Sequence, residues 1–328
     1  MTSSRHWRLA LPALLLVLPA ASAADSVEAR CRAIAARTAL PPALPPPKGP
    51  CDAYALTYGI PGRSGRPPDP KAALACASAA DPASEEILGG SAILATLYAN
   101  GLGVPRDLDR AGAFVCRAGL AEAEQEGMLD ALAAMRAAGG RVAPFAVCDH
   151  ATSALLGTAC AVRQEADRAA RDEDSFADIA ATLSAPARDR LAILRDGARA
   201  FASAVAGNEV DRSGTAAPVF AIEAERAQAD AFLATLKQLL GGTLTAAQPL
   251  PAADRALNTA YGRLMKAPAP FSGGTVTRDD VRATQRAWLA YRDRFAAFAA
   301  LAAPSVPPEV LKAVLTAQRT AQLVALAP

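Results

Sequence analysis

The sequence is rich in alanine and poor in aromatic, isoleucine and valine residues, and this balance constrains the fold more than any other feature. Aromatic residues make up 5% of the 328 residues. Alanine has the highest helix propensity of the amino acids, whereas isoleucine, valine and aromatic residues are enriched in strands. The composition therefore predicts an all-α protein.

The first residues have the pattern of a secretory signal peptide. Arg5 and Arg8 precede an apolar run, residues 9–18, and Ala21-Ser22-Ala23 supplies small residues for cleavage. A membrane anchor is the alternative, but the run is about half of the roughly 20 apolar residues that cross a bilayer. We therefore predict a signal peptide at 1–23 and a periplasmic or secreted chain that begins near Ala24.

The charge balance argues against nucleic acid as a partner. Removal of Arg5 and Arg8 from the 34 basic residues leaves 32, equal to the 32 acidic residues. A protein that neutralises many phosphates needs a cationic surface. No second long apolar stretch follows, so we expect no membrane span in the mature chain.

All six cysteines follow the signal peptide: Cys31, Cys51, Cys76, Cys116, Cys148 and Cys160. An even number in an oxidising compartment predicts disulfides, although six cysteines allow 15 pairings. A metal site is the alternative, but no CxxC occurs and His150 is the only histidine after the leader. We predict neither a bound metal nor a cofactor.

Three pairings are favoured among the fifteen. Cys51–Cys76 would join the start of one helix to the end of an antiparallel partner. Cys148–Cys160 is possible only if the helix between them is broken, because twelve helical steps span about 18 Å. Cys31–Cys116 is left by elimination.

The first half, residues 24–143, is predicted to form helical hairpins. Expected helices cover 25–38, 51–58, 70–80, 91–100 and 107–120, and prolines follow the first of them at 41–47. A hairpin of this size cannot bury its apolar face alone, so neighbouring hairpins should stack.

The hairpin over 91–120 has a recognisable pattern. Its small and apolar positions, Ala92, Leu94, Ala95, Leu97 and Tyr98, precede Gly101-x-Gly103 and Asp107. Glycine permits the left-handed backbone after a helix, and aspartate caps the next one. This pattern resembles the Sel-like repeat, which implies an α-solenoid fragment that contacts other proteins and has no catalytic residues. A plain helical hairpin is the alternative.

The second half, 144–328, is predicted to be an antiparallel helical bundle with an internal repeat at an offset of 87 residues. Ala166-Asp167-Arg168-Ala169 recurs as Ala253-Asp254-Arg255-Ala256, and Arg199-Ala200-Phe201 recurs as Arg286-Ala287-Trp288. The two copies cover 148–210 and 248–326. Chance matching in an alanine- and arginine-rich chain is the alternative.

The later copy contains a long amphipathic helix over 278–302, with Thr277 and Asp280 as its predicted cap and a last helix expected at 308–326. Its apolar positions recur at steps of three and four: Val281, Thr284, Trp288, Tyr291, Phe295 and Phe298. We expect this stripe to face the core.

A longer string in the same copy resembles a known family. Arg282-x-x-Gln285-Arg286-x-Trp288-Leu289-x-Tyr291-Arg292-Asp293 is followed by Leu315-Thr316-x-Gln318-Arg319-x-x-Gln322-Leu323. This order resembles the LprI-type lysozyme-inhibitor domain of bacterial envelopes. The resemblance implies that Cys148 and Cys160 are the opening cysteines of the domain. The family often has a cysteine after Tyr-Arg-Asp, where this chain has Arg294 and Phe295.

The candidate binding residues come from this string: Arg286, Trp288, Tyr291, Arg292 and Asp293. Tryptophan, tyrosine and arginine are favoured interface anchors where they are exposed. The alternative is a structural seam. If the helices over 253–264 and 278–302 pack antiparallel, Asp254 or Asn258 would meet Arg286 or Arg292.

An acidic run lies in the earlier copy: Glu165, Asp167, Asp172, Glu173, Asp174 and Asp178. It is either a solvated helix face or a docking patch for a cationic partner, such as a lysozyme.

We predict no enzymatic activity. One histidine gives little material for a Ser-His-Asp arrangement, and no glycine-rich phosphate loop follows a strand. The resemblance implies a periplasmic, non-catalytic binding protein of the lysozyme-inhibitor type, with a protein partner. The alternative is an envelope adaptor that uses its Sel-like hairpins for protein contacts.

Overall fold

The computed structural model describes residues 26–49, 51–81, 86–139, 143–271 and 274–327. The predicted signal peptide lies outside them. The described residues form twelve α-helices and one short 3-10 helix, and they contain no strand beyond two isolated bridges, Ile60–Arg66 and Phe271–Val276. The all-α prediction is confirmed.

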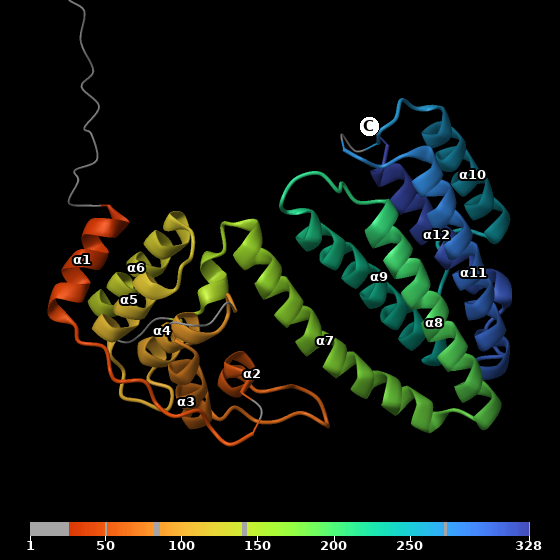
Figure 1. Ribbon diagram of the computed structural model, residues 1–328. Helices are drawn as coiled ribbons and strands as arrows, with labels where there is room; N and C mark the ends of the chain where they lie inside the picture. Colours follow the sequence, from red (N-terminus) through yellow and green to blue (C-terminus); the bar gives the residue numbers. More distant parts are fainter. Residues whose placement is uncertain (1–25, 50, 82–85, 140–142, 272–273, 328) are drawn as a thin grey trace, which may run out of the picture.

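Six helices form the N-terminal group in Figure 1: α1 (Val27–Arg37), α2 (Ala53–Tyr58), α3 (Pro70–Ala80), α4 (Gly90–Asn100), α5 (Leu108–Arg117) and α6 (Glu122–Ala137). Five of them match the expected ranges. The sixth, α6, follows the N-cap residue Ala121, which has no capping side chain; instead Glu124 accepts a hydrogen bond from the Ala121 N–H at 3.0 Å.

The turn between α4 and α5 has the backbone that its glycines predict. Gly101 and Gly103 adopt φ values of 69° and 70°, in the left-handed region. A Cβ on Gly103 would lie 2.8 Å from the carbonyl of Pro70, so the turn packs closely on the start of α3. Asp107 caps α5 by accepting hydrogen bonds from the N–H groups of Asp109 and Arg110. The turn therefore holds two hairpins together.

The second half continues with the 3-10 helix η1 (Val147–His150) and then six α-helices: α7 (Ala154–Thr182), α8 (Ala185–Asn208), α9 (Ala217–Leu240), α10 (Leu250–Lys266), α11 (Arg278–Ala302) and α12 (Pro308–Ala325). The last two agree with the predicted ranges.

The helices α8 and α11 pack against one another along their length and run antiparallel. Phe201 stacks on Tyr291 with ring centroids 5.4 Å apart, and the Thr284 hydroxyl donates to the Ala204 carbonyl at 3.2 Å. The helix α9 covers α8, while α10 covers α12. The predicted repeat, with its offset of 87 residues, would make α8 and α11 equivalent; it stays a prediction.

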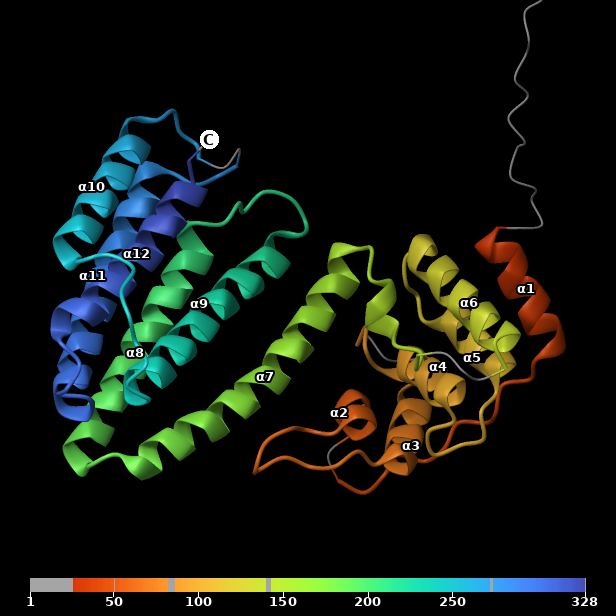
Figure 2. The same ribbon diagram turned by 180° about the vertical axis from the view of Figure 1, so that it is seen from behind.

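Two separate apolar cores lie at the two ends of the molecule. One is formed by residues between Val27 and Cys160, and the other by residues between Leu191 and Leu326. The helix α7 runs between the two groups in both views (Figures 1 and 2). Its first turns contribute Leu156 and Cys160 to the first core, but no residue between Ala161 and Thr182 is buried.

The structure contains three disulfides, Cys31–Cys116, Cys51–Cys76 and Cys148–Cys160, which are the three favoured pairings. The last one closes because the chain between η1 and α7 leaves the helical conformation at Ala151 to Ser153. Disulfides of this number are typical of extracytoplasmic proteins. Among the helices in the described ranges, none is long and apolar enough to cross a membrane.

Candidate functional site

The string that resembles the LprI domain lies on α11, and a reciprocal cap fixes the start of this helix. The Thr277 hydroxyl accepts a hydrogen bond from the Asp280 N–H at 3.2 Å, and the Asp280 carboxylate accepts one from the Thr277 N–H at 2.9 Å. All six positions of the predicted apolar stripe are buried. The cap and the stripe are therefore confirmed.

Two of the five candidate binding residues lie in the core. Trp288 is 1% exposed and Tyr291 is 5% exposed. Tyr291 stacks on Phe201 and meets Phe232 edge to face, with centroids 6.1 Å apart. Burial raises the pKa of the Tyr291 phenol. In this structure both rings support α11 from inside the bundle.

The other three candidate residues lie at the surface of α11. Arg286 and Asp293 are exposed, and Arg292 is half-buried. The Arg292 guanidinium lies 5.2 Å from the centroid of the Trp288 ring and forms an ion pair with Asp293 at 3.1 Å. The string therefore has an inner face that packs and an outer face that a partner can reach.

The later part of the string, on α12, contains Arg319, which is the centre of a buried polar network inside the bundle. Its side chain is fully buried. It donates to both carboxylate oxygens of Glu209, at 2.7 and 2.5 Å, and its Nε donates to Gln285 Oε1 at 2.9 Å.

The network extends to a third helix, α9. Arg319 Nη1 donates to Gln322 Oε1 at 3.0 Å, and Gln322 Nε2 donates to Gln228 Oε1 at 2.8 Å. The contacts join α12 to α11, to α9 and to the residue after α8. A buried pair of this kind fixes how helices register on one another. The sequence reasoning missed Glu209 and Gln228, since nothing in the local sequence marks either as a partner for Arg319.

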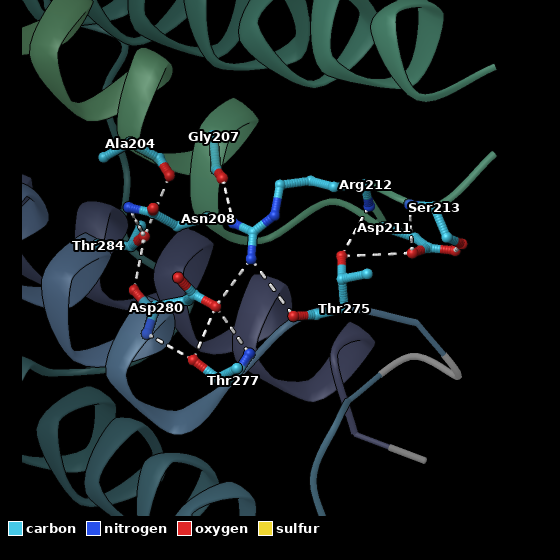
Figure 3. A network of polar contacts seen from close by, with 10 residues as sticks. All are labelled: Ala204, Gly207, Asn208, Asp211, Arg212, Ser213, Thr275, Thr277, Asp280 and Thr284. Atoms are coloured by element: carbon cyan, nitrogen blue, oxygen red, sulfur yellow. Dashed lines mark hydrogen bonds and ion pairs between the residues drawn. The ribbon is translucent and has the colours of Figure 1, made fainter. Parts of the chain in front are cut away.

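A second polar network ties the loop after α8 to the loop before α11 (Figure 3). Arg212 donates to the Gly207 carbonyl at 2.5 Å and to the Thr275 carbonyl at 3.3 Å, and it forms an ion pair with Asp280 at 3.2 Å. The Arg212 N–H also donates to the Thr275 hydroxyl at 2.7 Å.

Asp280 is thus shared between the cap of α11 and Arg212. Burial would raise the pKa of Asp280, but hydrogen bonds from Thr277 and Arg212 outweigh this effect and lower the pKa. The carboxylate therefore stays ionised at neutral pH and holds the start of the helix that carries the string.

Three of the six carboxylates of the acidic run on α7 form ion pairs within the chain. Glu165 pairs with Arg226 at 3.1 Å, Glu173 pairs with Arg195, and Asp178 pairs with Arg63. Asp174 accepts a hydrogen bond from the Arg63 N–H at 2.9 Å. Asp167, Asp172 and Asp174 form no ion pair with a described residue. The run is neither a fully solvated face nor an uninterrupted acidic patch.

The expected seam between α10 and α11 is wrong. The main partner of α10 is α12, and the main partner of α11 is α8. Within the described ranges, no hydrogen bond or ion pair joins Asp254 or Asn258 to Arg286 or Arg292. The helix α8, rather than α10, packs along α11. Its Phe201 and Ala204 make the contacts with α11 that were expected from Asp254 and Asn258.

The described part of the chain shows no candidate metal site. It contains no group of three or more histidine, cysteine, aspartate or glutamate side chains placed to hold a metal ion. His150 stacks on Phe145 with ring centroids 5.8 Å apart, next to the first core.

Comparison with known proteins identifies one class for part of this fold. Residues 238–323, from the end of α9 through most of α12, match a family of helical inhibitor domains whose description is "Lysozyme inhibitor LprI". The resemblance drawn from the Trp288 string is thereby confirmed for these residues, which lie in the second half of the chain. The earlier copy, 148–210, and the N-terminal hairpins lie outside the matched residues. No curated protein and no solved structure matches the chain.

Proposed function

We propose that this protein is an exported, non-catalytic binding protein that inhibits a lysozyme. The observation that carries the proposal is the match of residues 238–323 to the lysozyme-inhibitor family. Three disulfides are in keeping with action outside the cytoplasm, where lysozymes act on the cell wall. The predicted signal peptide would supply the route of export.

The outer face of α11 is the part of the matched domain that we propose contacts the enzyme. Arg286, Arg292 and Asp293 are accessible on this face. Trp288 and Tyr291 lie on the opposite, buried face and pack in the core of the bundle. Arginine side chains at a surface are frequent anchors of protein interfaces.

An inhibition assay tests the proposal. Purified mature protein is added to lysozymes of several classes, and the clearing of a peptidoglycan suspension is recorded. We expect a saturable loss of activity that ends at a fixed molar ratio with one class. Arg286→Ala should weaken inhibition without changing the melting temperature, and Arg190→Ala, an exposed arginine on α8, is its matched control. Full lysozyme activity at every ratio and with every class would contradict the proposal.

An envelope adaptor is the second candidate function, and one feature of the N-terminal hairpins favours it. A groove of about 470 Å³ lies between α1, α5 and α6, with Ile34, Leu129 and Leu132 in its wall. Three arginines line its rim, and Asp109 pairs with two of them, Arg37 and Arg136. Recovery of a specific envelope protein by the 24–143 hairpins, without inhibition of any lysozyme, would support this alternative.

A further inference from the structure

A second groove, of about 280 Å³, lies between α7, α8 and α9. Its floor is made of small side chains, among them Ala198, Ala202 and Ala229, and its lining includes Phe176 and Phe232, whose rings stack with centroids 5.7 Å apart. The groove exists because α7 places no buried residue against the bundle after Cys160. All residues that line it precede residue 238, so it lies outside the matched domain.

The rim of this groove has more acidic than basic groups. Glu165, Asp172, Glu173 and Glu225 line it, together with Arg195 and Arg199. Both arginines already have partners, since Arg195 pairs with Glu173 and Arg199 pairs with Asp196 at 2.7 Å.

Two of the lining carboxylates remain without an ion pair among the described residues: Asp172 on α7 and Glu225 on α9. Asp172 is half-buried, and burial, followed by the nearby Asp230, raises its pKa; Arg226, Lys237 and Arg168 act in the opposite direction but do not cancel the rise. The raised pKa means that the folded chain holds this charge at a cost, which a further cation placed beside the carboxylate would reduce.

The size and lining of the groove select the kind of group that fits. Its volume is at the lower limit of the roughly 300–1,000 Å³ that small-molecule sites enclose. One or two long side chains fit better than a cofactor. Lysine and arginine have an apolar stem and a charged end, so the stem can lie on the alanine floor while the charge meets the carboxylates.

We propose that the groove between α7, α8 and α9 is a docking site for a basic segment of a partner protein, which inserts a lysine or arginine between Asp172 and Glu225. The inference rests on the proposed function only in that the chain binds a protein. The charge of the rim determines the chemistry of the partner, whether or not that partner is a lysozyme.

The test is direct binding, measured by calorimetry, of the full mature chain to an eight-residue peptide of alternating leucine and arginine. A peptide with glutamate in place of arginine is the control ligand. We expect only the basic peptide to bind. The double variant Asp172→Asn with Glu225→Gln should lower the affinity by about tenfold, which is the combined effect of two modest ion pairs.

Two further variants of the chain test whether the peptide binds in the groove. Ala169→Trp fills the mouth of the groove from an exposed position and should also weaken binding. The matched double variant Asp189→Asn with Glu223→Gln removes the same charges from exposed positions of α8 and α9 outside the groove, and should bind like the wild type.

The melting temperature separates loss of the site from loss of the fold. Asp172→Asn should not lower it, because the raised pKa makes the ionised carboxylate unfavourable in the folded chain. No binding of the basic peptide, or equal binding by the groove variants and the wild type, would overturn the inference. The proposed function is tested separately, by measuring lysozyme inhibition with the same proteins.

Discussion

At the scale of single residues, Glu124 shows how a buried carboxylate is held without an ion pair among the described residues. It is 1% exposed and accepts backbone N–H hydrogen bonds from Ala121, Thr152 and Ser153, at 3.0, 3.0 and 2.8 Å. Burial alone would raise the pKa of Glu124, but the hydrogen bonds outweigh it and the pKa is lowered. Through these bonds, the start of α6 is joined to the start of α7.

Glu124→Gln should reduce the free energy of unfolding at pH 7 by about 1–3 kcal/mol, because the amide cannot accept all three hydrogen bonds as well as the carboxylate. A lowered folded-state pKa gives stability that is present above the ordinary value of 4.5 and is lost as the pH falls through the folded value. Urea unfolding at several pH values should therefore show the deficit shrinking below pH 4.5. Glu126→Gln, exposed on the same helix, is the control, and an equal effect there would contradict the explanation.

Trp288 distinguishes a core residue from an interface anchor. Removing a buried tryptophan typically costs about 3–5 kcal/mol, so Trp288→Ala should lower the melting temperature markedly. Phe201→Ala, on the facing helix, should do the same to a lesser degree. Thermal unfolding followed by circular dichroism checks both. A Trp288→Ala protein that melts like the wild type yet loses its partner would mean that this side chain leaves the core to bind.

At the scale of helices, the Arg319–Glu209 pair determines whether α12 and the end of α8 stay in register. Arg319→Met leaves a buried carboxylate without its cation, which typically costs about 3–5 kcal/mol. The double variant Arg319→Met with Glu209→Met removes both charges and should recover most of this loss. Urea unfolding of the four proteins measures the coupling. Single variants that each lose less than about 1 kcal/mol would show that the pair does not hold the helices.

The positions of several helices could be predicted from the sequence, whereas the pairing of the helices could not. The helices α3, α4, α11 and α12 were predictable because proline, glycine or a cap marks each end and the apolar period is local information. The pairing of α11 with α8 was not, because both helices offer apolar stripes that would fit several neighbours. Glu209 was missed for the same reason: its partner Arg319 is 110 residues away.

The candidate site, too, could be predicted from the sequence only in part. The order of residues in the Trp288 string was enough to predict the family of the domain that contains it. Which of these residues face outward was not predictable, because Trp288 and Tyr291 belong equally to a core stripe and to an interface by composition. Only the position of α8 over that stripe decides that they are buried.

At the scale of the whole molecule, the two cores suggest where the chain can be divided. Residues beyond 143 do not all belong with the second half, since Phe145, Val147, Leu156 and Cys160 pack into the first core. The second core draws on α7 only from Phe176 onward. We therefore propose that α7, rather than the segment near Ala143, contains the division between two folding units.

A fragment that starts at Ala161 should fold cooperatively and inhibit lysozyme, because it keeps every residue of the second core and contains no cysteine. A fragment that starts at Ala143 should be less soluble, since it exposes Phe145, Val147 and Leu156, which the hairpins bury in the intact chain. Calorimetric unfolding and lysozyme inhibition of both fragments, beside the complementary 24–160 fragment, measure the difference. Inhibition found only in the 24–160 fragment would place the function in the hairpins, and an Ala161 fragment that fails to fold would show that the hairpins are needed to complete the second core.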